Sequence, residues 1–85
     1  MTDNPMAPLR AQIDDLDDQI IRLLAARYAL LAEVVKVKAA HQIPHHVPAR
    51  VAQVLERNEA TAVAAGLPQG LVRNIYSLII DAAHE

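Results

Sequence analysis

The sequence predicts an all-α protein of three helices, one long and two shorter, and three observations support this fold class. Residues 8–40 contain no internal Gly or Pro over about 33 positions, which is long for one helix. Large aliphatic residues recur there at alternating spacings of three and four, the period of one helical face. Pro and Gly then divide the remaining chain into two shorter segments with apolar periodicity.

The first helix is expected over residues 8–40, after a disordered leader of residues 1–7. Pro8 suits a first helical turn, where its missing N–H would have no partner anyway. Aspartates near the start and lysines near the end complement the helix dipole. The inward-facing series is interrupted by one cation, Arg27, and its apolar members are Leu9, Ile13, Leu16, Ile20, Leu23, Leu30, Val34 and Val37.

Two prolines, Pro44 and Pro48, predict a crossing to a second helix over residues 50–65. Gly66 is expected to end that helix in the left-handed conformation, and Pro68 to open the third helix. The positions expected to face inward on the second helix are Val51, Val54, Leu55 and Ala62. The apolar stripe of the third helix is expected to be Leu71, Ile75, Leu78, Ile79 and Ala82.

The size and composition predict a single domain, residues 1–85, that associates with another chain. Hydrophobic residues make up 53% of the sequence, more than a three-helix monomer of this length would be expected to bury. A helix of about 33 residues spans ~50 Å, whereas a compact globule of this length has a radius of gyration of about 12 Å. Such a helix protrudes unless a second chain covers it.

Charge and residue usage exclude several classes of partner. A net charge of -2 without a Lys/Arg run argues against a nucleic-acid partner. The absence of cysteine excludes disulfides and thiolate metal sites. No segment reaches the ~20 continuous apolar residues of a membrane span, and no secretory leader is recognisable, so we expect a cytoplasmic protein with no membrane partner.

Three cations on the long helix, Arg10, Arg27 and Lys38, predict a small anionic ligand. Arg27 and Lys38 are eleven positions apart, so they point the same way, separated by about 16 Å along the axis. Arg10 lies about 100° around the helix from Arg27 and roughly 25 Å away. Each cation alone suits an ordinary surface or interface position. Two antiparallel copies of the helix would bring the three together, and Arg50 at the next helix start would add a fourth.

Catalytic groups of other kinds are not apparent in the sequence. His41 and His45 have a spacing of four, but Pro44 breaks the helix that metal ligation at this spacing requires. We therefore interpret these histidines as surface residues and expect no metal or cofactor. No nucleophile with an adjacent base and no paired catalytic carboxylates can be recognised.

Three segments of the chain resemble the all-helical chorismate mutases: LRAQIDDLDDQIIRLLAARYALLAEVVKVK, PARVAQVLER and GLPQGLVRNIYSLII. The resemblance covers most of the chain from Leu9 onward, and the spacing of the four cations agrees with that family's motif. It implies an intertwined homodimer with two equivalent sites, each receiving Arg10 of the partner subunit. The implied substrate is a dicarboxylate held by Arg10 and Arg27, with Lys38 at its ether oxygen and Arg50 lining the pocket. Arg27 and Lys38 would be the catalytic residues of a Claisen rearrangement to prephenate.

Three site positions depart from the family's pattern. Val51 stands where a glutamate usually follows the arginine of the second helix, Val47 where some members have an aspartate, and Ala83 where a serine is expected. Two relatives with the same fold also suit Val51: isochorismate pyruvate-lyases, which form salicylate and pyruvate, and aminodeoxychorismate mutases. A non-catalytic dimerisation or regulatory module is the alternative of another class. We take a chorismate-type mutase as the main hypothesis and the pyruvate-lyase as its first alternative.

Overall fold

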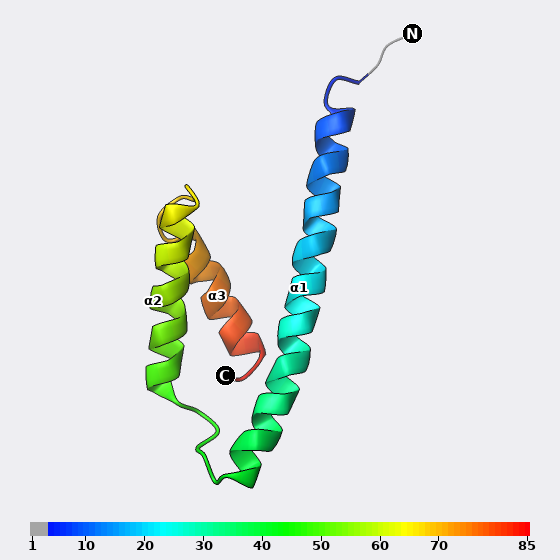
Figure 1. Cartoon of the computed structure of the whole chain (residues 1–85). Helices are drawn as coiled ribbons and strands as arrows, with labels where there is room; N and C mark the ends of the chain where they lie inside the picture. Colours follow the sequence, from blue (N-terminus) through cyan, green and yellow to red (C-terminus); the bar gives the residue numbers. More distant parts are fainter. Residues whose placement is uncertain (1–3) are drawn as a thin grey trace. The chain divides into compact units, whose positions relative to one another are not determined.

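A computed structural model, which describes residues 4–85, shows three helices in the order α1 (Ala7–Ala40), α2 (Pro48–Ala64) and α3 (Leu71–Ala82) (Figure 1). The predicted all-helical fold of one long and two shorter helices is confirmed for these residues, which contain no strand. The chain divides into two units at Val34 and Val35, inside α1. No helix in the described part of the chain is long and apolar enough to span a membrane.

The start of α1 is organised by Asn4. Its Oδ1 accepts a hydrogen bond from the Met6 N–H at 2.9 Å, and its carbonyl oxygen accepts one from the Ala7 N–H at 3.1 Å. The helix therefore begins at Ala7, one residue before the expected start, and Pro8 lies in the first turn as predicted. Residues 1–3, the beginning of the expected leader, lie outside the described residues.

Helix α1 runs for 34 residues and contains no buried residue. Its predicted apolar face is exposed along its whole length; Leu23, for example, is 70% exposed and Leu30 66%. Arg27, Leu31 and Lys38 are half-buried. The apolar periodicity that predicted this helix is thus real, and the side chains that form it are largely exposed.

All three helices end in the same hydrogen-bonding pattern, in which a left-handed residue follows the last turn. That residue is Gln42 after α1, Gly66 after α2 and His84 after α3, with φ values of 56°, 81° and 55°. In each case the next N–H donates to a carbonyl five residues back, from Ile43 to Lys38 at 2.9 Å in the first. Gly66 confirms the sequence prediction, whereas the other two are side-chain-bearing residues in a conformation that favours glycine.

Helices α2 and α3 form an antiparallel hairpin with the core between them (Figure 1). Val54 and Ala62 are buried on α2 as predicted, and Val51 and Leu55 are half-buried. On α3 the buried residue is Ile80, at 4% exposure.

Two expectations about α3 were wrong. The helix begins at Leu71 rather than Pro68, because Gly70 has φ 84°, a left-handed conformation that a right-handed helix cannot include. The expected stripe also lies mostly on the wrong face: Ile79 is half-buried, but Leu71, Ile75, Leu78 and Ala82 are exposed. The face toward α2 consists of Val72, Tyr76, Ile80 and Ala83. Since α3 is apolar on both faces, its second face remains uncovered in one chain.

The ending of α1 gives a stability prediction. We expect Gln42→Gly to raise the free energy of unfolding by about 1 kcal/mol, because glycine relieves the cost of a left-handed side-chain-bearing residue. The matched substitution Gln53→Gly, inside α2, should lower it by about 1 kcal/mol. Urea denaturation followed by circular dichroism measures both. Equal destabilisation by the two substitutions would contradict the left-handed conformation of Gln42.

Candidate functional site

The seven residues predicted for the site divide between the two units of the chain. Arg10 and Arg27 lie on α1 before Val34. Arg10 is exposed and Arg27 is half-buried. The other five lie in the second unit, residues 35–85, and they are Lys38, Val47, Arg50, Val51 and Ala83. The second unit therefore supplies most of the predicted site.

Lys38 lies in the last turn of α1 and is half-buried. Its ammonium Nζ donates a hydrogen bond of 2.8 Å to the main-chain oxygen of His45, in the connection between α1 and α2. This contact orders the connection and leaves two of the three ammonium donors for other acceptors. The partner is a neutral carbonyl, so the positive charge of Lys38 is not neutralised by this contact.

Arg50 lies in the first turn of α2 and is exposed. Its Nη1 donates to Oε1 of Gln53, one turn further along the helix, at 2.7 Å. The acceptor is again neutral, and a guanidinium carries five donor hydrogens, so most of its capacity for an anion remains. Lys38 and Arg50 thus share a feature that suits cations of a site for an anionic ligand.

Val47 and Val51 lie one turn apart at the start of α2, and both are half-buried. Val47 is the N-cap residue, in an extended conformation, and its carbonyl oxygen accepts from the N–H groups of Arg50 and Val51 at 3.0 and 3.3 Å. A valine cannot cap a helix with its side chain, and no side-chain cap is formed here. The two positions carry apolar side chains where the resemblance implies carboxylates, and we refer to this pair as the apolar wall.

Ala83 is the C-cap residue of α3 and is half-buried. Two residues later, the main-chain oxygen of Glu85 lies 3.0 Å from Nδ1 of His46. His46 directly precedes Val47, so the end of α3 meets the segment that leads into α2. The structure thereby brings the Ala83 segment and the Val47 segment together, although they are far apart in the sequence.

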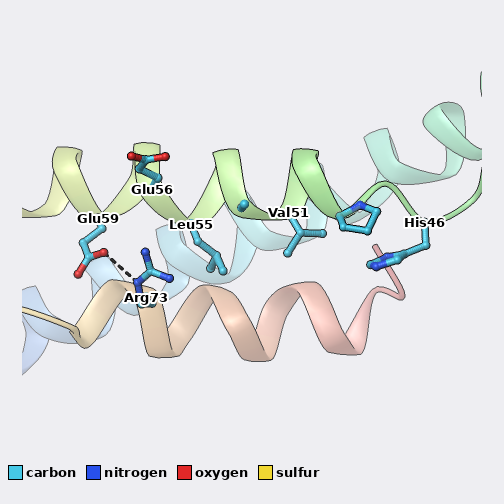
Figure 2. Close-up of a pocket in the computed structure, with 8 residues that line it drawn as sticks. His46, Val51, Leu55, Glu56, Glu59 and Arg73 are labelled. Carbon is cyan, nitrogen blue, oxygen red and sulfur yellow. Dashed lines mark hydrogen bonds and ion pairs between the residues drawn. The ribbon is translucent and has the colours of Figure 1, made fainter.

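A pocket of about 560 Å³ lies between α2 and α3 (Figure 2). Nε of Arg73, on α3, forms an ion pair of 2.8 Å with Oε2 of Glu59, on α2. Of the seven predicted residues, Val51 is the one that lines this pocket. The full lining is His46, Pro48, Val51, Ala52, Leu55, Glu56, Glu59 and Arg73.

The cation of this pocket differs from the predicted site cations. Arg73 is paired with a carboxylate, whereas Lys38 and Arg50 are held by neutral oxygen acceptors. The sequence analysis did not identify Arg73, Glu59 or His46. Opposite charges on neighbouring antiparallel helices could have suggested the Arg73–Glu59 pair, but nothing in the sequence indicates the contact of His46 with Glu85.

Metal ligation has no candidate among residues 4–85, because no three of their His, Cys, Asp or Glu side chains are grouped as ligands would be. His41 and His45, the pair with a spacing of four, are both exposed.

Comparison with known proteins identifies the family. The family model for chorismate mutase type II matches residues 9–85. The T-protein of Enterobacter agglomerans is 39% identical over 79 residues, which cover 93% of this chain and 21% of the T-protein. The bifunctional chorismate mutase/prephenate dehydratase of Aquifex aeolicus is 34% identical over 77 residues, with 87% of this chain and 21% of that protein covered.

A third relative is a shorter protein, the 4-amino-4-deoxychorismate mutase of Streptomyces venezuelae. It is 31% identical over 77 residues, which cover 91% of this chain and 75% of the relative. By contrast, the chain spans about a fifth of the length of the T-proteins that it matches. No solved structure gives a significant match. Because the family model covers all three helices and the four predicted cations, this chain belongs to the chorismate mutase type II family.

Proposed function

We propose that this chain is a chorismate mutase-type enzyme, which rearranges chorismate, or an analogue substituted at C4, to prephenate or its analogue. The observation that carries this proposal is the family match over residues 9–85, which includes Arg10, Arg27, Lys38 and Arg50. The Claisen rearrangement is unimolecular and needs no nucleophile or proton donor. A site composed of cations and apolar walls therefore has the chemistry that the reaction requires.

In this proposal the cations hold the substrate and stabilise the transition state. Arg10 and Arg27 bind the two carboxylates, and Arg50 lines the same pocket. Lys38 approaches the ether oxygen, where negative charge builds as the C–O bond breaks. Its hydrogen bond to the His45 carbonyl leaves donors for that oxygen and fixes the ammonium near the start of α2. The remaining catalytic contribution is the folding of the enolpyruvyl arm over the ring.

We further propose that two chains form an intertwined homodimer and that residues 1–85 act in it as one domain. Two observations support this. Helix α1 has no buried residue, and the second apolar face of α3 is exposed, with Leu78 at 72%. A surface of this kind on one chain is typical of an obligate interface. In such a dimer, Arg10 of the partner subunit would complete each site. The cytoplasmic location expected from the sequence stays a prediction.

The substituent at C4 distinguishes the candidate substrates. Val47 and Val51 offer no hydrogen bond to the C4 hydroxyl of chorismate, which would cost about 1–3 kcal/mol if that group were buried. The similarity to the 4-amino-4-deoxychorismate mutase of Streptomyces venezuelae favours a C4 amine as the second candidate. An isochorismate pyruvate-lyase, whose substrate has no hydroxyl at C4, is a further outcome that the assay must distinguish.

The first prediction from the proposed function concerns the reaction. Purified protein supplied separately with chorismate, isochorismate and aminodeoxychorismate should convert chorismate or its C4 amine to the prephenate-type product, followed by absorbance and chromatography. Release of salicylate and pyruvate from isochorismate would instead identify the lyase. Failure to turn over any of the three would favour a non-catalytic module and contradict the proposal.

The second prediction concerns Lys38. Lys38→Ala should lower kcat about a hundredfold with little change in KM, because the lost donor acts on charge that develops only in the transition state. The control is Lys36→Ala, an exposed lysine of the same helix turn, which should keep near-normal kcat. A matching loss in kcat and in substrate affinity for Lys38→Ala would argue against its role at the ether oxygen.

The third prediction concerns Arg10. Arg10→Ala and Lys38→Ala should each be nearly inactive, but refolding them together as a mixture should restore about a quarter of the wild-type activity. The reason is that half of the dimers are then mixed, and each mixed dimer has one site with both residues intact. If Arg10 acted in the site of its own chain, every site would lack one residue and no activity would return.

A further inference from the structure

The connection between α1 and α2 is fastened at two consecutive residues. The His45 carbonyl accepts from Lys38 at 2.8 Å, and the His46 ring meets the main-chain oxygen of Glu85 at 3.0 Å. The first contact ties the connection to the end of α1, and the second ties it to the end of α3. The three helix ends in this region therefore meet at a two-residue segment directly before Val47.

The second contact determines which nitrogen of the His46 ring carries the proton. Glu85 is the last residue of this sequence, and its main-chain oxygen accepts a hydrogen bond whether it belongs to a carbonyl or to a terminal carboxylate, so this hydrogen bond requires the proton on Nδ1. In the neutral ring this leaves Nε2 as an acceptor. Figure 2 places His46 at one end of the α2–α3 pocket, opposite the Arg73–Glu59 pair.

This contact lies at the open end of the α2–α3 hairpin, where it can control how closely the two helix ends are held together. Residues 65–70 join α2 and α3 at one end, but α2 is 17 residues long, so the other end lies about 25 Å away. At that distant end, Ile80 is the buried residue of α3. Apolar packing of one residue is not directional, whereas a hydrogen bond fixes both distance and orientation.

We propose that His46 is a positioning residue, which holds the end of α3 against the start of α2 through its Nδ1–H···O bond to Glu85. It thereby sets the spacing between the Ala83 segment and the wall formed by Val47 and Val51. This role rests on the proposed function, because these segments matter for rate only if they enclose the substrate. Nothing about the ring suggests a direct part in the chemistry.

Substitutions at position 46 separate the hydrogen bond from the bulk of the ring. Asn places an amide donor at the same distance from the main chain as Nδ1, Gln places it one bond further, and Leu removes it. We expect His46→Leu and His46→Gln to lower kcat/KM about fivefold or more, and His46→Asn to stay within about twofold of wild type. His41→Ala, an exposed histidine of the same connection, is the control and should leave kcat/KM unchanged.

A second set of measurements needs no turnover. Nitrogen NMR of the wild-type chain in alkaline buffer should show the His46 ring protonated at Nδ1. Amide hydrogen exchange of residues 83–85 should become faster in His46→Leu and recover in His46→Asn, while exchange near Ala62 stays constant in all variants. The last readout shows that the hairpin core is intact, so a general loss of folding is distinguished from a loosened end.

Several results would overturn the proposal. A ring protonated at Nε2, or identical exchange and kcat/KM in the Asn and Leu variants, would exclude the hydrogen bond as the positioning element. If the wild-type chain turned over none of the three substrates while the NMR and exchange results were as expected, the contact would be real but the proposed function would fail, and the positioning role with it.

Discussion

The uncovered apolar surface of α1 is the constraint on which the rest of this protein depends. In residues 4–85 the buried hydrophobic side chains are Val54, Ala62 and Ile80, while hydrophobic residues are 53% of the whole sequence. Three buried side chains, two of them small, cannot offset the conformational entropy of ordering a chain of this length. The missing burial must come from another surface, and a second copy of α1 has the same periodic face to offer. This requirement agrees with the proposed homodimer, in which Arg10 of the partner subunit would complete the site.

Much of the fold could be predicted from the sequence because its local rules agree with one another. The spacing of three and four predicts α1, and Gly66 predicts the end of α2. The left-handed Gln42 and His84 could not be predicted, since neither residue type marks that conformation. The buried face of α3 could not be predicted either. Leucine and isoleucine occupy two adjacent faces of that helix, and periodicity cannot tell which face meets α2 and which is exposed.

Only those residues of the candidate site that are related by regular helical spacing or by a helix start could be proposed from the sequence pattern alone. Arg27 and Lys38 are related by helical geometry, and Arg50 by its place at a helix start, so spacing suggests them as candidates, and their role in a site stays a prediction. The contacts that organise the site are of another kind. His46 meets Glu85 across 39 positions and Arg73 meets Glu59 across 14, so both depend on how α2 and α3 pack. Tertiary packing of this kind leaves little trace in the local pattern of a single sequence.

The partners of the cations explain how the two valines could be compatible with an anion site. A carboxylate at position 47 or 51 would compete with a dianionic ligand for Lys38 and Arg50. Here both cations are held by neutral oxygens, the His45 carbonyl and the Gln53 amide, so their positive charge stays available. Arg73 is the contrasting case, because Glu59 already neutralises it. In the proposed reaction, the absence of acids at these two positions therefore sacrifices a hydrogen bond to the C4 substituent but strengthens the positive field acting on the carboxylates and the ether oxygen of the substrate. On this argument the valines alter which substrate is preferred and leave intact the positive field that the proposed rearrangement needs.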